Sequence, residues 1–215
     1  MSEQATAWRF PESDQYMRGE MARDGSYQGT HLDVALRYVT DWRCAIDGGA
    51  HVGTWSRLMA GRFEKVIAAE PSPDTFACLQ ANMASFGCSN VECRQLALGR
   101  QPGLVSMALD GKEVLRANTG ARYVRPGGEI ACEPIDDWHL PALGFLKLDV
   151  EGSELAALCG ALETLYRCRP IVLFEAKGFG KKRYGEVIHA VPDFLSQIRY
   201  RKLDAISRDE IWGPA

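Results

Sequence analysis

The sequence lacks the long apolar runs, paired cysteines and basic excess that mark several classes of protein. It has no stretch of about 20 consecutive apolar residues, the length that a membrane-spanning helix needs. Its N-terminal segment, MSEQATAWRFPESDQ, is polar and carries no apolar signal core. The seven cysteines include no C-x-x-C pair, which argues against structural zinc and for a reducing compartment. We therefore expect a cytoplasmic protein without a membrane partner.

The chain also lacks an excess of positive charge. It has 25 Lys and Arg against 28 Asp and Glu, a net charge of −3. Such a protein has no basic field to hold a phosphate backbone, so nucleic acid is not an expected partner. The 215 residues suffice for one domain with a substantial core. We predict an N-terminal arm over residues 1–30 and a single domain over residues 31–215, and the oligomeric state stays open.

Short apolar strands alternate with amphipathic helices along most of the chain. The predicted main strands cover residues 44–47, 66–70, 91–98, 145–149 and 171–175. Between them, apolar residues recur at helical spacing, as Phe76, Leu79 and Met83 do. This alternation favours parallel βαβ units and a doubly wound α/β sheet. Two late strands, over residues 200–206 and 210–212, have no helix between them and favour an antiparallel edge.

Several smaller features carry local expectations. We expect residues 1–30 to be irregular and Thr30 to cap the helix that follows them. Residues 135–138 are expected to form a helical turn. The spacing of Leu155, Leu158, Leu162 and Leu165 marks a helix that is expected to break near Gly160. The basic, glycine-rich stretch over residues 177–185 is predicted as a loop.

Four of the apolar strands end in a carboxylate: Asp47, Glu70, Asp149 and Glu175. In an open parallel sheet, the carboxyl ends of the strands face one crevice, and ligands bind there. Four acids at one rim repel one another, so their grouping indicates a polar or cationic ligand. S-adenosylmethionine offers a ribose diol, an ammonium and a sulfonium.

The first of these strands runs into the glycine-rich turn Asp47–Gly53. Glycine permits a tight turn and close approach of a ligand to the backbone, and the next helix begins there. The dinucleotide fingerprint G-x-G-x-x-G fails because His51 stands where its second glycine belongs, and no P-loop lysine follows. Glu70 lies about 20 residues further on, where an acid binds the ribose of a nucleoside cofactor. The spacing suits NAD or S-adenosylmethionine, and the turn favours the latter.

These residues resemble the FkbM family of methyltransferases over about residues 40–200. The matching segments are residues 45–53, 69–73, 97–99, 145–154 and 170–175. The Lys-x-Asp-x-Glu-Gly stretch over residues 147–152 is the most distinctive of them. One departure is Gly48, where the family leads us to expect a larger apolar residue, so a looser turn is expected there.

The resemblance implies a class I, Rossmann-like fold and S-adenosyl-L-methionine as the methyl donor. It also implies O-methylation of a sugar or small-molecule hydroxyl. Gly49 and Gly53 would shape the turn, Asp47 would order it or meet the donor's amino group, and Glu70 would hold the ribose. The full set of expected cofactor-binding residues is Asp47, Gly49, Ala50, His51, Gly53, Glu70, Pro71, Ser72, Gln95 and Ala97.

The expected catalytic residues are Asp149, Lys147 and Glu151. Methyl transfer to a hydroxyl needs a base for its proton, and Asp149 ends a strand beside the donor crevice. Alternation along the strand puts Lys147 on the same face, where it either stabilises a developing alkoxide or pairs with Asp149. His51 is a further candidate base or a packing residue of the turn. Glu175 is expected on the acceptor side.

Other readings stay open. Metal binding at Lys147, Asp149, Glu151 and Glu175 is an alternative, since oxygen-rich sites suit Mg²⁺, but their spacing shows no dense ligand cluster, so no metal is predicted. Glu151 and Glu154 are also expected to favour the first turn of a helix through its dipole. Residues 177–184 are either a lid over an anionic or sugar substrate or a solvated loop. Within the arm, residues that would close the site are Tyr16, Tyr27 and Gln28.

Two other functions compete with the leading one. The first is a methyltransferase that acts on nucleic acid or protein, although no Asn/Asp-Pro-Pro-Tyr/Phe signature for flipped bases follows any strand. The second is a protein that binds S-adenosylmethionine without catalysis. The acceptor itself is not readable from the sequence beyond a small molecule or glycan.

Overall fold

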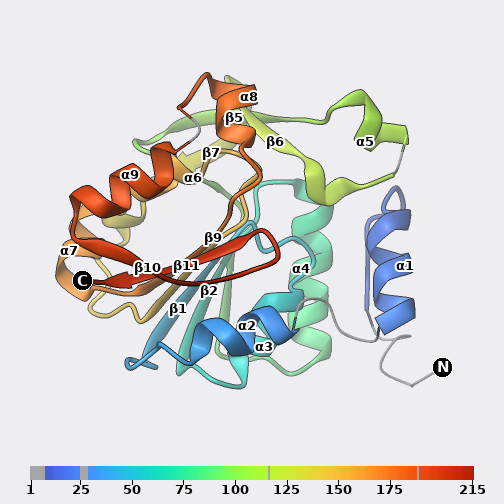
Figure 1. The fold of residues 1–215 in the computed structure, drawn as a ribbon. Coiled ribbons are helices and arrows are strands. Elements are labelled where there is room, and N and C mark those ends of the chain that lie inside the picture. Colours follow the sequence, from blue (N-terminus) through green and yellow to red (C-terminus); the bar gives the residue numbers. More distant parts are fainter. Residues whose placement is uncertain (1–7, 25–28, 116, 188) are drawn as a thin grey trace.

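A seven-stranded sheet in the order β10-β11-β9-β8-β1-β2-β3 forms the centre of the computed structural model, which describes residues 8–24, 29–115, 117–187 and 189–215. Its parallel strands are β1 (Cys44–Gly48), β2 (Lys65–Ala69), β3 (Val91–Arg94), β8 (Phe145–Leu148) and β9 (Ile171–Glu175). The antiparallel edge strands are β10 (Tyr200–Ile206) and β11 (Asp209–Pro214). The predicted doubly wound, mostly parallel sheet with an antiparallel edge is therefore confirmed (Figure 1).

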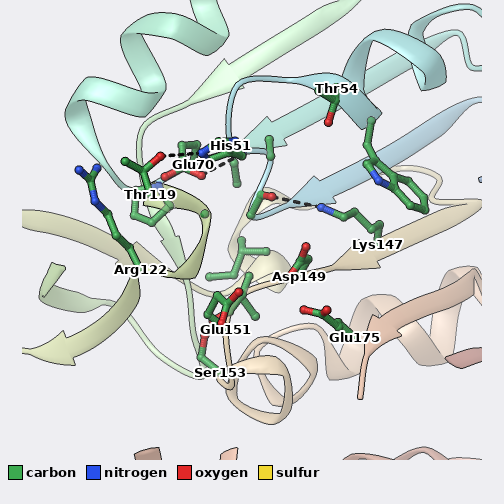
Figure 2. Close-up of a pocket in the computed structure, with 18 of the residues that line it drawn as sticks. His51, Thr54, Glu70, Thr119, Arg122, Lys147, Asp149, Glu151, Ser153 and Glu175 are labelled. Atoms are coloured by element: carbon green, nitrogen blue, oxygen red, sulfur yellow. Dashed lines mark hydrogen bonds between the residues drawn. The ribbon is translucent and has the colours of Figure 1, made fainter. Parts of the chain in front are cut away.

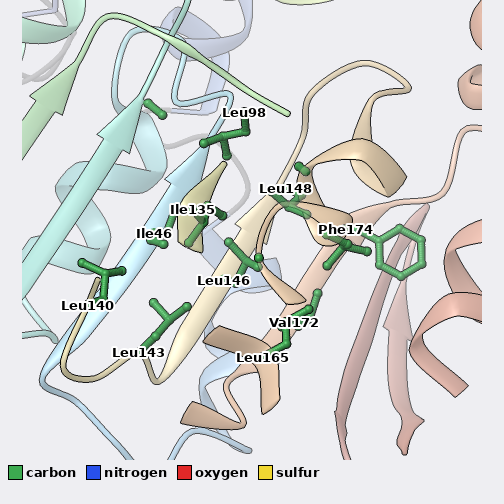
Figure 3. Packing of buried hydrophobic residues seen from close by; sticks show 14 of the residues in the cluster. Ile46, Leu98, Ile135, Leu140, Leu143, Leu146, Leu148, Leu165, Val172 and Phe174 are labelled. Carbon is green, nitrogen blue, oxygen red and sulfur yellow. The ribbon is translucent and has the colours of Figure 1, made fainter. Parts of the chain in front are cut away.

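Helices cover both faces of this sheet because successive side chains of each strand point to opposite sides. Ala45, Phe145 and Leu173 pack toward α2 (Gly29–Leu36) and α3 (Thr54–Ala60). On the other face, Ile46, Leu146 and Val172 enter a larger cluster (Figure 3). The helices and turns that complete this cluster are α6 (Glu154–Cys159), α7 (Leu162–Cys168), α9 (Ala190–Gln197) and the 3₁₀ turn η2 (Ile135–Trp138). Strands buried on both faces explain the nearly continuous apolar runs of the sequence.

A second sheet of four strands, in the order β4-β7-β5-β6, accounts for the irregular middle of the chain. Its strands are β4 (Ala97–Leu98), β5 (Gly103–Ala108), β6 (Tyr123–Pro126) and β7 (Ile130–Glu133). The single strand predicted over residues 91–98 is therefore wrong. β3 ends at Arg94, Gln95 is exposed, and the chain re-enters the protein at Leu96 to pair β4 with β7. In the sequence, the polar pair Arg94 and Gln95 marks the break between the two strands.

Three local expectations are wrong and two are confirmed. The arm contains helix α1 (Gln15–Asp24), which begins after Asp14 because that side chain accepts the N–H of Met17 at 3.0 Å in the manner of an N-cap. Thr30 lies inside α2, and a short helix α8 (Phe179–Tyr184) occupies the predicted loop. The helix break at Gly160 and the turn η2 are confirmed. Further short elements are α5 (Gly111–Leu115) and η1 (Thr119–Ala121).

Helix α4 (Pro73–Ser85) packs Phe76, Leu79 and Met83 against Ala68 on the α3 side of the sheet.

All seven cysteines are free. Within the described residues, no helix has the length and apolarity to cross a membrane.

Gly160 separates α6 from α7 because its backbone lies against Gly99. A Cβ atom at Gly160 would stand 1.9 Å from the carbonyl oxygen of Gly99. We predict that Gly160→Ala lowers the free energy of unfolding by about 1–3 kcal/mol through this overlap. Gly19→Ala, in α1 with open space around it, is the matched control and should be neutral or add up to about 1 kcal/mol. Urea denaturation measures both, and an unchanged Gly160→Ala protein would contradict the close approach.

Candidate active site

A cavity of about 450 Å³ opens at the carboxyl ends of β1, β2, β8 and β9, a size typical of small-molecule sites. It lies where the strand order reverses between β1 and β8, the switch point at which open α/β sheets bind ligands. Glu70, Asp149 and Glu175 line it, as predicted from the strand ends (Figure 2). The fourth acid, Asp47, is fully buried behind the lining.

Asp47 and Lys147 form a buried ion pair across β1 and β8, where they are register partners. Lys147 Nζ lies 2.9 Å from Asp47 Oδ1 and 3.1 Å from the carbonyl oxygen of Gly49, and Ser56 Oγ donates to Asp47 Oδ2 at 2.7 Å. Burial alone would lower the pKa of Lys147, but the charges of Asp47 and Asp149 outweigh it and raise that pKa. The direct partner of Lys147 is thus Asp47, whereas Asp149 was the expected one. Both carboxylate oxygens of Asp47 serve to order the turn.

The glycine-rich turn needs glycine at two positions for different reasons. Gly49 has a φ of +72°, and a Cβ there would lie 1.9 Å from the carbonyl oxygen of Asp149. Gly53 has a φ of +91°, and a Cβ there would clash with the side chains of Met83 and Leu79. These contacts let the turn pass tightly between β8 and α4.

Gly48 does not loosen the turn, contrary to the expectation drawn from the family. It is a regular residue of β1, paired with Ala69 on one side and Leu148 on the other. The side chains of Leu98 and Leu148 fill the space of a missing Cβ, which they would approach to 2.7 and 2.9 Å. Neighbouring leucines therefore replace the bulk that the larger residue would supply.

Glu70 joins the two loops that border the cavity. Its Oε2 accepts the backbone N–H of His51 and its Oε1 accepts that of Ser72, each at 2.9 Å. Burial raises the pKa of Glu70, and these hydrogen bonds together with the charge of Arg122 oppose that shift. A carboxylate held from two loops is aimed at one place in the cavity.

The predicted cofactor-binding residues fall into three groups. Those that line the cavity are Gly49, Ala50, His51, Glu70, Pro71 and Ala97. Those buried outside the lining are Asp47, Gly53 and Ser72. Gln95 is exposed and does not line the cavity. The cause is the break after β3, which brings Leu96, Ala97 and Leu98 to this position instead.

Asp149 and Glu175 lie side by side, with one carboxylate oxygen of each within 4.8 Å of the other (Figure 2). Burial and the neighbouring negative charge of Asp149 raise the pKa of Glu175 to about 9. Burial also acts to raise the pKa of Asp149, but the charges of Lys147 and Lys177 outweigh it and lower that pKa. A proton on this pair of acids therefore belongs on Glu175, and Asp149 stays ionised at neutral pH.

The acids of this cluster are closer together than their sequence spacing indicates. One oxygen each from Asp149, Glu151 and Glu175 lies within 4.8 Å of the others, a spacing that a metal ion can bridge. Lys177 Nζ, however, is 2.5 Å from Glu175 Oε2 and 3.2 Å from Glu151 Oε1. Its ammonium already supplies the positive charge that a bound cation would bring. Arg183 adds a second contact to Glu151 at 3.0 Å.

The segment over residues 177–184 is not simply a solvated loop. The side chain of Arg183 is 4% exposed, and Tyr184 OH donates to the carbonyl oxygen of Val124 at 2.9 Å. Lys177 lines the cavity.

Glu154, at the start of α6, is buried and accepts the N–H of Gly152 at 3.0 Å, and burial raises its pKa to about 7.

Sequence reasoning missed two polar contacts that border the cavity. Thr119 Oγ1 lies 2.9 Å from His51 Nε2, and His31 Nδ1 lies 2.7 Å from Asp209 Oδ2. Each pair joins residues far apart in the chain, and no local pattern marks them. Tyr16, expected to close the site, lines the cavity. The other two arm residues expected to do so, Tyr27 and Gln28, lie outside the described residues.

The parallel sheet, its switch-point cavity and the acid-tipped strands define a class I, Rossmann-like methyltransferase fold. The model of the methyltransferase FkbM domain matches residues 47–202. This match covers well over half of the chain, which therefore belongs to the FkbM methyltransferase family.

Two relatives illustrate the similarity. The chain is 23% identical over 141 residues to Methyltransferase 1 of Beauveria bassiana (strain ARSEF 2860), covering 54% of this chain and 57% of that protein. The crystal structure of methyltransferase FkbM from Methylobacillus flagellatus KT has a TM-score of 0.59 and 19% identity, covering 97% of this chain and 49% of that one. The chain thus spans about half the length of these relatives, and the second likeness shows the fold.

The buried Glu154 predicts a pH dependence of stability. Its pKa of about 7 in the folded protein exceeds the ordinary value of about 4.3, so the unfolded chain loses the proton first as pH rises. The contribution of Glu154 to the free energy of unfolding is therefore fully present below pH ~4.3 and falls by about 3 kcal/mol up to pH ~7. Glu154→Gln stays neutral, keeps an oxygen for Gly152, and should abolish this contribution. Unfolding free energies of both proteins across that pH range test it, and parallel curves would contradict it.

Proposed function

We propose that the protein transfers a methyl group from S-adenosyl-L-methionine to a hydroxyl of a sugar or another small molecule. The observation that carries the proposal is the placement of Glu70. It lines the cavity at the end of β2, beside the glycine-rich turn, with each oxygen fixed by a backbone N–H. An acid at this point of an open α/β fold binds the ribose hydroxyls of a nucleoside ligand. Membership of the FkbM family supports the choice of donor.

The donor site is built from backbone and apolar surface as well as from Glu70. The turn from Gly49 to His51 lets the ligand approach the main chain closely, because Gly49 carries no side chain. The apolar residues Leu96, Ala97 and Leu98 line the cavity where an adenine ring would pack. Bound there, the donor supplies an activated sulfonium methyl, so the protein chiefly has to align the acceptor and exclude water.

Asp149 is the base in this proposal. It lines the cavity at the end of β8 and is ionised, since Lys147 and Lys177 hold its pKa low and a proton on the pair of acids belongs on Glu175. Among the described residues, its Oδ1 is buried without a fixed hydrogen-bond donor. As an acceptor oxygen forms its bond to the methyl carbon, the carbon–sulfur electrons pass to sulfur and the hydroxyl proton passes to Asp149. A positioned base of this kind contributes about 10²–10⁴-fold in rate.

The remaining predicted catalytic residues act on the base and the loops in this scheme. Lys147 holds the turn through Asp47, and Glu151 holds Lys177 and Arg183 beside the acceptor side of the cavity.

A cavity of about 450 Å³ and a net charge of −3 favour a small acceptor over nucleic acid. The free cysteines fit a reducing, cytoplasmic setting.

Replacement of Glu70 by Ala should remove most of the donor affinity. S-adenosylhomocysteine, the demethylated donor, should raise the stability of the wild-type protein by about 2.7 kcal/mol at 100 times its Kd. Glu70→Ala should lose most of that gain in a thermal-shift assay, because the ribose contact and the anchor of both loops disappear. The exposed Glu64→Ala should keep the full gain. An equal gain in all three proteins would remove Glu70 from the donor site.

Replacement of Asp149 by Asn should separate binding from chemistry. The variant should bind S-adenosylhomocysteine like the wild type but transfer methyl groups about 10²–10⁴-fold more slowly, because an amide accepts no proton. Transfer of labelled methyl from the donor to a panel of sugars and small hydroxyl compounds measures the rate. Asp137→Asn, at an exposed acid, is the control. Full activity of Asp149→Asn would exclude Asp149 as the base.

A further inference from the structure

The buried acid Asp14 joins the N-terminal arm to two segments of the candidate donor site. Asp14 is fully buried, and Thr119 Oγ1 donates a short hydrogen bond to its Oδ2. The same oxygen lies 3.1 Å from His51 Nε2, which in turn lies 2.9 Å from Thr119 Oγ1. One carboxylate therefore meets the glycine-rich turn at His51 and the η1 segment at Thr119.

His51 carries this contact on to Glu70. Its backbone has a φ of +50°, an uncommon conformation for a residue with a side chain. The backbone N–H of His51 donates to Glu70 Oε2 at 2.9 Å, while the imidazole is held by Asp14 and Thr119. The orientation of the turn and of the ribose-binding acid is thus coupled to the arm.

The arm also forms part of the cavity. Tyr16 and Met17 of α1 line it together with the segment Asn118–Gly120. The carbonyl oxygen of Ala117 accepts the backbone N–H of Gln15 at 3.1 Å. Further along α1, Met21 packs with Trp8 and with Val52 of the glycine-rich turn. Arm and η1 segment together close the side of the cavity next to the glycine-rich turn.

A buried carboxylate is costly unless it is well paired, and docking of an arm does not by itself require one. Burial acts to raise the pKa of Asp14, but hydrogen bonds from His51 and Thr119 outweigh it and lower that pKa. The apolar cluster around Trp8 and the bonds of Asn82 to Arg9 already anchor the arm. The charge is therefore placed where it orients His51.

We propose that Asp14 is a positioning residue of the donor site, which sets the glycine-rich turn and Glu70 through His51 and holds the arm over the bound nucleoside. This inference rests on the proposed function, since it assumes a nucleoside-containing donor in the cavity. It adds the N-terminal arm to the binding machinery.

The test measures binding of S-adenosylhomocysteine by calorimetry, with the melting temperature of each unliganded protein recorded beside it. Asp14→Asn and Thr119→Val should each weaken binding about tenfold, or about 1.4 kcal/mol. The double variant should be no weaker than the weaker single one, because both changes act on His51. Glu12→Gln, an exposed acid of the same arm, should bind within about twofold of wild type.

The ¹⁵N signals of the His51 imidazole give a readout that simple docking of the arm would not move. They should shift in Asp14→Asn and Thr119→Val and stay in place in Glu12→Gln. Wild-type affinity in Asp14→Asn, or additive losses that follow the melting temperature with an unchanged His51 signal, would overturn the proposal. Should Asp14→Asn not fold, Thr119→Val carries the same test. Failure of the wild-type protein to bind the probe would overturn the proposed function itself.

Discussion

The candidate site depends on the buried ion pair of Asp47 and Lys147. These residues are partners across the two strands where the sheet reverses its order, and Lys147 also holds the carbonyl oxygen of Gly49. Loss of one member of such a pair leaves an uncompensated buried charge, which costs about 3–5 kcal/mol. The pair therefore fixes the start of the glycine-rich turn, and its positive charge also helps to keep Asp149 ionised.

Charge is distributed over the cavity in two groups with different surroundings. Glu70 is held by backbone N–H groups, whereas Asp149, Glu151 and Glu175 are balanced by Lys177 and its neighbours. The first arrangement suits a neutral diol, because two backbone N–H groups fix the direction of the carboxylate and no ammonium of the described residues occupies its oxygens. The second lets one carboxyl hold a proton while its neighbour remains ionised, as paired acids in one site do. The two groups of acids in the cavity are therefore chemically distinct.

The sequence predicted those parts of the protein that local pattern controls. Apolar runs ending in Asp47, Glu70, Asp149 and Glu175 placed four parallel strands correctly and brought three of these acids to the cavity, because strand period and chain order determine both. The break at Gly160 was also visible. Contacts between distant segments could not be predicted. Strand alternation alone does not decide whether Lys147 pairs with Asp47 or with Asp149, and no local pattern links Asp14 to Thr119. The single strand predicted over residues 91–98 was wrong because the chain leaves one sheet after Arg94 and enters another at Ala97.

The central claim is that acids at the ends of successive strands converge on one adenosyl compound. A crystal structure of the protein with S-adenosylhomocysteine tests it most directly. The account predicts the ribose hydroxyls on the Glu70 carboxylate, the amino acid end near Gly49, and the sulfur facing Asp149. Electron density for the compound outside this cavity, or a ribose without contact to Glu70, would contradict it.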